Sequence, residues 1–271
     1  MSRFDWTPLR VAVGSLRYHG VSVCVGGEAA FAYFNSLFVD YDDPDDQGPV
    51  LELIVSDEWF PAATGILCSS GLFQPLPSAP DSLGFDGGWR ALNGFPHLKT
   101  TGWCSSLSAI AIVPGSCAGI NPEDRSVFVE IYDAVTDKNF GACLDLQGLS
   151  LDAIKFLPWP RLPVFMRSLP KRLGKPANPV ASADDDSDET AVDLENHFQA
   201  AVEDLVDGMN ISLEWVYRHV NVQDPELAAR VRQAVNKRFE RLDWMEPGNR
   251  ITRAIKNTEH AEVIALIPGH D

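Results

Sequence analysis

Two adjacent glycines and one carboxylate stand where a phosphate or metal site could form. Gly26-Gly27 follows the apolar run Val21–Val25, and Glu52 lies inside a second apolar run, Val50–Val55. Glycine lets a ligand approach the backbone closely, and free N–H groups at the start of a following helix bind phosphate. The two glycines, with Glu28 after them, are therefore candidate ligand-binding residues. A tight turn between a strand and a helix explains the same glycines without a ligand.

The second apolar run holds only one of the two carboxylates that metal-assisted group transfer needs. Two acids at positions i and i+2 of a strand project from one face and together hold Mg²⁺. Val50 occupies the first position, so Glu52 stands alone, and one carboxylate cannot hold two metal ions. The acidic segment Asp40–Asp46 lies nearby, and a solvated loop is its favoured interpretation. Glu130, inside Val127–Tyr132, is the candidate further acid, so Glu52 and Glu130 are the candidate catalytic residues and, in an active enzyme, metal ligands.

Alternating helix and strand patterns place these residues on an α/β sheet. Apolar residues at helical spacing predict a first helix over Pro8–Gly20, and continuous apolar runs predict buried strands. Ser56, followed by two acids, predicts the N-cap of a helix that ends at Gly71. This rhythm indicates a sheet flanked by helices. The predicted strands are Val21–Val25, Val50–Val55, Leu107–Val113 and Val127–Tyr132, with another helix over Glu28–Phe38.

The second half of the chain is predicted to be mainly helical. Patterns over Leu149–Leu157 and Val164–Leu173 indicate two helices. Ser212 predicts one helix N-cap, and Asp224, followed by Pro225, predicts another. Two closing strands are predicted at Ile251–Ile255 and Glu262–Ile267.

These elements divide the chain into three parts. Residues 1–173 form the predicted α/β domain, and residues 193–271 form a helical C-terminal region that packs on it. Between them, residues 174–192 are acidic and rich in Pro, Ala and Ser, so they cannot bury enough apolar surface to order themselves. We expect a disordered linker or insertion there.

Composition excludes some classes of function. The 271 residues carry a formal net charge of -16, which disfavours nucleic-acid binding because that affinity rests on Lys and Arg neutralising phosphates. The five cysteines form no C-x-x-C pair, so we expect free thiols and a reducing compartment. The N-terminus lacks a signal-peptide pattern, and no apolar run reaches the roughly 20 residues that span a bilayer. We therefore expect no membrane association and an intracellular location, cytoplasmic or nuclear.

The passage VSVCVGGEAAFAYF, followed by VLELIVSDEWFPAATGILCSSGLF, resembles the start of nucleotidyltransferase-fold proteins. More narrowly, it resembles a group of uncharacterised fungal proteins with that fold, and the likeness continues through LPWPRLPVFMRSL and VDGMNISLEWVYRHV. The resemblance implies a mixed sheet flanked by helices, a Gly-Gly turn, strand carboxylates, Mg²⁺ and a nucleoside triphosphate. Gly26 and Gly27 match the turn and Glu52 matches one strand acid, while Val50 stands where the first acid belongs.

Three hypotheses of function follow. The leading one is a degenerate, non-catalytic nucleotidyltransferase-like protein that binds a small ligand or a protein partner in the ancestral cleft. The second is an active Mg²⁺-dependent nucleotidyl- or phosphotransferase acting on a small molecule or a protein, with Mg²⁺ and a nucleoside triphosphate as cofactors. The third is an intracellular interaction protein without an active site.

Overall fold

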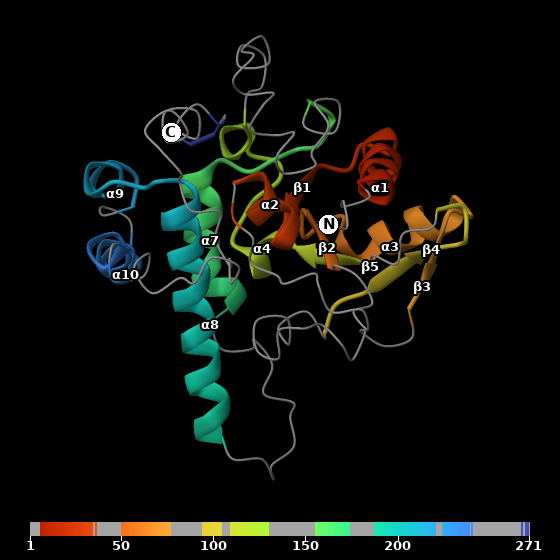
Figure 1. Ribbon diagram of the computed structural model, residues 1–271. Coiled ribbons are helices and arrows are strands. Elements are labelled where there is room, and N and C mark those ends of the chain that lie inside the picture. Colours follow the sequence, from red (N-terminus) through yellow and green to blue (C-terminus); the bar gives the residue numbers. More distant parts are fainter. Residues whose placement is uncertain are drawn as a thin grey trace.

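The sheet and its flanking helices confirm the predicted α/β class. The computed structural model describes residues 6–34, 36, 50–76, 94–104, 109–129, 155–173, 187–220, 224–238, 240, 267, 269 and 270. Within these residues, five strands form one mixed sheet in the order β1-β2-β5-β4-β3 (Figure 1). The strands are β1 (Val23–Gly26), β2 (Val50–Val55), β5 (Ala109–Pro114), β4 (His97–Thr100) and β3 (Phe73–Pro75).

The neighbouring strands β2 and β5 are parallel, and every other neighbouring pair is antiparallel. All six residues of β5 are buried, which fits a near-continuous apolar run covered on both faces. One face of β2 presents Leu51, Leu53 and Val55 to the main core, and the other presents Ile54 to a smaller cluster with Ala111.

Helices cover both faces of this sheet. The helices α1 (Thr7–Tyr18) and α3 (Phe60–Ser69) contact one another and contribute Leu9, Leu16 and Leu67 to the main core. On the other face, α4 (Gly115–Ala118) contributes Ala118 to the smaller cluster. The short α2 (Gly27–Tyr33) continues directly from β1.

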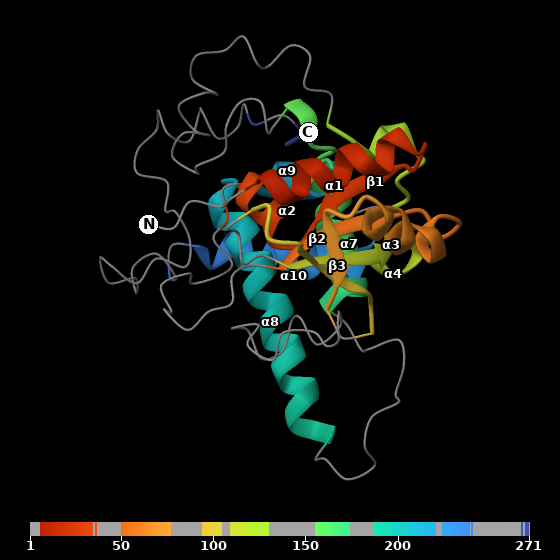
Figure 2. The ribbon, with the colours of Figure 1, turned by 90° about the vertical axis from the view of Figure 1, so that its right-hand side faces the viewer.

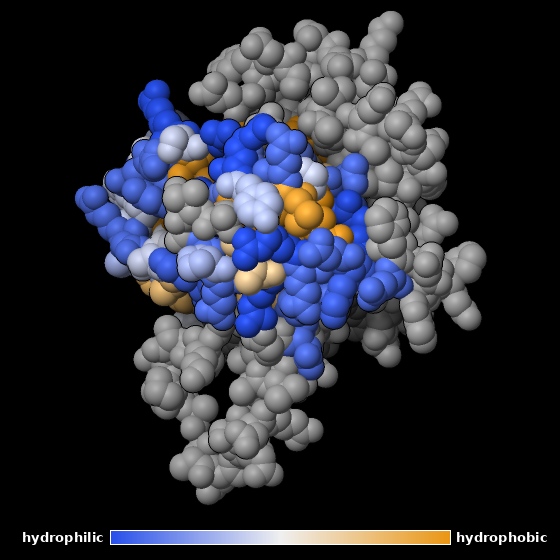
Figure 3. Space-filling view, turned by 90° about the vertical axis from the view of Figure 1, so that its left-hand side faces the viewer, coloured by the Kyte–Doolittle hydropathy of each residue, from blue (hydrophilic) through white to orange (hydrophobic). Residues whose placement is uncertain are grey.

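The C-terminal helices form a layer beside the sheet. In this layer α7 (Leu162–Leu173) contacts α4 and α8 (Ser187–Gly208), while α10 (Pro225–Asn236) contacts α8 and α9 (Leu213–His219). The N-terminal half of α8 extends away from the other labelled elements (Figures 1 and 2). The face over α9 and α10 is mostly hydrophilic, with small apolar patches (Figure 3). No helix in the described part of the chain is long and apolar enough to cross a membrane.

Both predicted caps in this layer are confirmed. The Ser212 side chain accepts a hydrogen bond from the Trp215 N–H, and the Asp224 side chain accepts one from the Leu227 N–H. Each oxygen satisfies a backbone donor that has no partner inside its helix.

Ser56 is not the predicted N-cap of α3. The helix begins at Phe60 and has no side-chain cap, and the Ser56 carbonyl instead accepts hydrogen bonds of 3.0 Å from the Trp59 and Phe60 N–H groups. An extra turn therefore precedes the helix, and Pro61 in its first turn suits this later start because that position needs no N–H partner.

The strand predicted over Val127–Tyr132 is wrong at its start. Residues Arg125–Val127 form a 3₁₀ turn, η2, because the Asp124 side chain accepts a hydrogen bond from the Ser126 N–H and turns the chain. Phe128 then makes a single bridge to Pro160.

Some predicted boundaries differ from those observed. The helix α2 ends at Tyr33, short of the predicted Phe38, and α8 begins at Ser187, inside the acidic segment 174–192. Ile267 is buried but lies in a bend, and the predicted strand Ile251–Ile255 falls outside the described residues.

Candidate functional site

The Gly26-Gly27 pair forms the predicted turn from strand to helix. Gly26 ends β1 in an extended conformation, and Gly27 starts α2 with φ +57°, in the left-handed region that glycine enters without strain. Gly27 also bridges to Leu51 of β2. This backbone geometry explains the second glycine on its own. Glu28, in the first turn of α2, is buried.

Strand register places Glu52 beside the same turn. Glu52 lies directly opposite Gly26 on β1 and opposite Ala111 on β5. Both neighbours are small, so they leave room around a side chain in the interior of the sheet. The side chain of Glu52, a candidate catalytic residue and metal ligand, has no solvent exposure. The predicted residues Gly26, Gly27, Glu28 and Glu52 are thus brought together, but at buried positions.

The structure adds His97 to this row of residues. His97 of β4 lies opposite Ala111, so the row across the sheet reads Gly26, Glu52, Ala111, His97. Directly opposed residues point to the same face, and two strand spacings put the Glu52 and His97 Cα atoms about 10 Å apart. The Ala111 methyl group between them fills little of that gap.

A hydrogen bond to a backbone carbonyl holds the imidazole of His97 in one tautomer. Its Nδ1 lies 2.9 Å from the Phe95 carbonyl, which can only accept, so Nδ1 carries the proton. Nε2 is buried and has no hydrogen-bond partner among the described residues. Burial lowers the pKa of His97 and outweighs the hydrogen bond to Phe95, which raises it. The ring is therefore neutral near pH 7, with a lone pair on Nε2.

No motif in the sequence marks His97 as a site residue. His97 has no His or Glu partner at a metal-binding spacing along the chain, and its position depends on pairing between β4 and β5. The alternation of apolar and polar residues along β4 is the one local signal that could indicate His97. The strand has only four residues, which is too short for that alternation to be recognised.

The structure does not test whether the other predicted acids join Glu52. Glu130 and Asp40–Asp46 lie outside the described residues. The strand next to β2 is β5, whose sequence Ala-Ile-Ala-Ile-Val-Pro contains no carboxylate. No group of three or more His, Cys, Asp or Glu side chains that could hold a metal occurs in the part of the chain that the structure describes. Within the row of Gly26, Glu52, Ala111 and His97, one carboxylate and one imidazole supply two ligands, fewer than a Mg²⁺ or two-metal site requires.

The described thiols agree with the expectation for the cysteines. Cys68 and Cys117 are free thiols, and burial raises the pKa of Cys68. A raised pKa disfavours the thiolate, which is the reactive form, so Cys68 is not an activated nucleophile.

Comparison with known proteins adds no relative. No protein-family model matches the chain, and no curated protein is detectably similar to it.

Proposed function

We propose that this chain is a nucleotidyltransferase-like protein that has lost catalysis and acts by binding a small ligand or a protein partner. The observation that carries the proposal is the row Gly26, Glu52, Ala111, His97, in which Glu52 is the only carboxylate and is fully buried.

The arrangement of the strands supports the likeness to that fold. The strand β1 runs into the Gly26-Gly27 turn and α2, and its neighbour β2 carries Glu52 and pairs in parallel with β5. A parallel pair needs a crossover, and α3 lies between β2 and β5 along the chain. The glycine turn and the strand acid thus meet at one edge of the sheet, as the resemblance implies.

The chemistry of the row supports the loss of catalysis. Two-metal transfer needs carboxylates that hold both ions between the nucleophile and the leaving group. Position 50, two residues before Glu52, holds valine, and β5 offers alanine where a further acid would face Glu52. Solvent also does not reach Glu52, so a triphosphate could approach it only after a rearrangement of the structure.

A transfer assay tests this proposal. The purified chain is incubated with each labelled nucleoside triphosphate and Mg²⁺ or Mn²⁺. Three kinds of acceptor are tested: the chain itself, a mixture of small molecules, and a protein extract. We expect no incorporation of label above that of a heat-denatured control. The matched variant Glu52→Gln keeps the shape and removes the charge, and incorporation by the wild type that Glu52→Gln abolishes would refute the proposal.

A further inference from the structure

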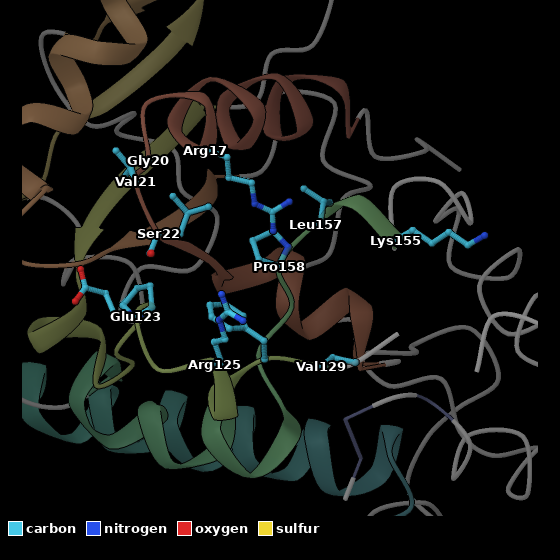
Figure 4. Close-up of a pocket in the computed structure, with 13 residues that line it drawn as sticks. Arg17, Gly20, Val21, Ser22, Glu123, Arg125, Val129, Lys155, Leu157 and Pro158 are labelled. Carbon is cyan, nitrogen blue, oxygen red and sulfur yellow. The ribbon is translucent and has the colours of Figure 1, made fainter. Parts of the chain in front are cut away.

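A second site lies at the opposite end of β1 from the glycine turn. An open pocket of about 850 Å³ is formed by the end of α1, the start of β1, the segment 122–129 and the segment 155–158 (Figure 4). Pockets of roughly 300–1,000 Å³ are the size that small-molecule ligands occupy. None of Gly26, Gly27, Glu28 and Glu52 lines it.

The charge of this pocket is opposite to that of the whole chain. Its lining includes three cations, Arg17, Arg125 and Lys155, and one carboxylate, Glu123, in a protein of net charge -16. Within the described residues, none of the three cations forms an ion pair with a carboxylate. Three cations without acidic partners in one concave site repel each other, and a bound anion would relieve that repulsion.

The two arginines face the pocket from different walls. Arg17 extends from α1 and Arg125 from the segment after α4, toward the middle of the pocket, whereas Lys155 points away (Figure 4). Arg17 donates one hydrogen bond of 2.7 Å to the Phe156 carbonyl, and its guanidinium carbon lies 5.6 Å from the centre of the Phe156 ring. These contacts hold the Arg17 side chain in place and leave its other N–H groups for a ligand, so less entropy is lost on binding.

The remaining wall is apolar. Val21, Val23, Phe128, Leu157 and Pro158 line the pocket beside the two arginines. Of the apolar lining residues, Phe128 and Val129 keep exposed surface, which an inorganic ion would leave uncovered and an organic group attached to the anion would bury.

We propose that this pocket binds a small organic phosphate, with the phosphate held between Arg17 and Arg125 and the apolar part packed against Phe128 and Val129. Guanidinium groups match the geometry of phosphate oxygens and form paired, charge-assisted hydrogen bonds with them. A doubly charged phosphate monoester also balances the two facing cations better than a single carboxylate does. This inference goes beyond the proposed function and does not depend on the absence of catalysis.

Calorimetric titration with phenyl phosphate tests the inference. We expect wild-type protein to bind phenyl phosphate more tightly than inorganic phosphate, not to bind phenol, and to bind less tightly as NaCl is raised. The Arg125 side chain makes no hydrogen bond or ion pair with the described residues, so Arg125→Gln should fold normally and weaken binding by about 10- to 100-fold, the effect of losing a charged hydrogen bond. Arg218→Gln, on an exposed ion pair of α9, is the matched control and should bind as the wild type does.

Three results would overturn it. The first is no binding of phenyl phosphate by the wild type. The second is unchanged affinity in both Arg17→Gln and Arg125→Gln. The third is equal affinity for phenyl phosphate and phenol, which would show that the cations contribute nothing. A separate result, equal affinity for phenyl phosphate and inorganic phosphate, would refute the contact between the apolar part of the ligand and the pocket.

Discussion

Gly115 is the position where adding a single carbon atom should do most harm. It is the first residue of α4 and is buried between β5 and the loop that follows. A Cβ built on Gly115 would lie 2.6 Å from the Ile120 carbonyl oxygen and 3.2 Å from Pro122 Cδ. Gly65, in the middle of α3, is the matched control, because a Cβ there meets nothing within 4 Å.

The size of the effect follows from these distances. Ordinary contact begins at 3.4 Å, so Gly115→Ala forces the Ile120 backbone to move by the difference, 3.4 − 2.6 = 0.8 Å. The Gly115 carbonyl also accepts a 3.1 Å hydrogen bond from the Ile120 N–H, which this movement would strain. Overpacking of this kind costs about 1–3 kcal/mol of unfolding free energy. Gly65→Ala should instead stabilise the helix by about 0.5–1 kcal/mol, because alanine loses less backbone entropy.

Thermal unfolding followed by circular dichroism measures both variants against the wild type. For chains of this size each kcal/mol shifts the Tm by about 2–4 °C, so the two variants should shift it in opposite directions. Urea unfolding with an unchanged m value would show that each variant changes the stability and leaves the compactness of the denatured state unchanged. A Gly115→Ala variant as stable as Gly65→Ala would refute the close approach between α4 and the Ile120 carbonyl.

Two further predictions concern single side chains. Arg238 pairs at 3.2 Å with Asp207, which is almost fully buried, and donates to two backbone carbonyls, so Arg238→Ala should cost about 3 kcal/mol in urea unfolding. Arg218→Ala, which breaks an exposed pair, should change stability by less than about 1 kcal/mol, and equal losses in both variants would contradict the difference in burial. The pKa of His97 is lowered in the folded state, so the unfolded chain binds the proton more tightly and stability falls as the pH drops below the ordinary value of 6.5. His97→Gln should lose less stability between pH 7 and pH 5 than the wild type does; identical pH profiles for His97→Gln and the wild type would contradict the burial of a neutral imidazole.

Local signals in the sequence predicted the local structure well. The strand Val50–Val55 is observed with the predicted bounds, and the caps at Ser212 and Asp224 are confirmed. Each depends on a few consecutive residues: an apolar run, or a polar side chain three residues before the backbone N–H that it accepts from. The prediction of Ser56 as an N-cap was wrong because an additional turn follows Ser56. The N-cap position of α3 is occupied by Trp59.

The sites depend on contacts that no short pattern contains. His97 joins Glu52 only because β4 and β2 both pair with β5, so their relation requires the register of three strands. The basic pocket likewise brings Arg17, Arg125 and Lys155 together from three separate segments. Along the chain each of these cations is an ordinary surface residue, and only the fold shows that they line one concave site and form no ion pair with a carboxylate of the described residues.

Binding of ATP in the presence of Mg²⁺ or Mn²⁺, measured by calorimetry on the wild-type chain, tests the proposed loss of catalysis most directly. With Glu52 as the only carboxylate of its row and Ala111 opposite it, we predict no metal-dependent binding of ATP at the Gly26-Gly27 turn. Any binding that does occur should be independent of the metal and should persist in Glu52→Gln. Metal-dependent binding that Glu52→Gln abolishes would contradict the proposal and restore Glu52 as a metal ligand.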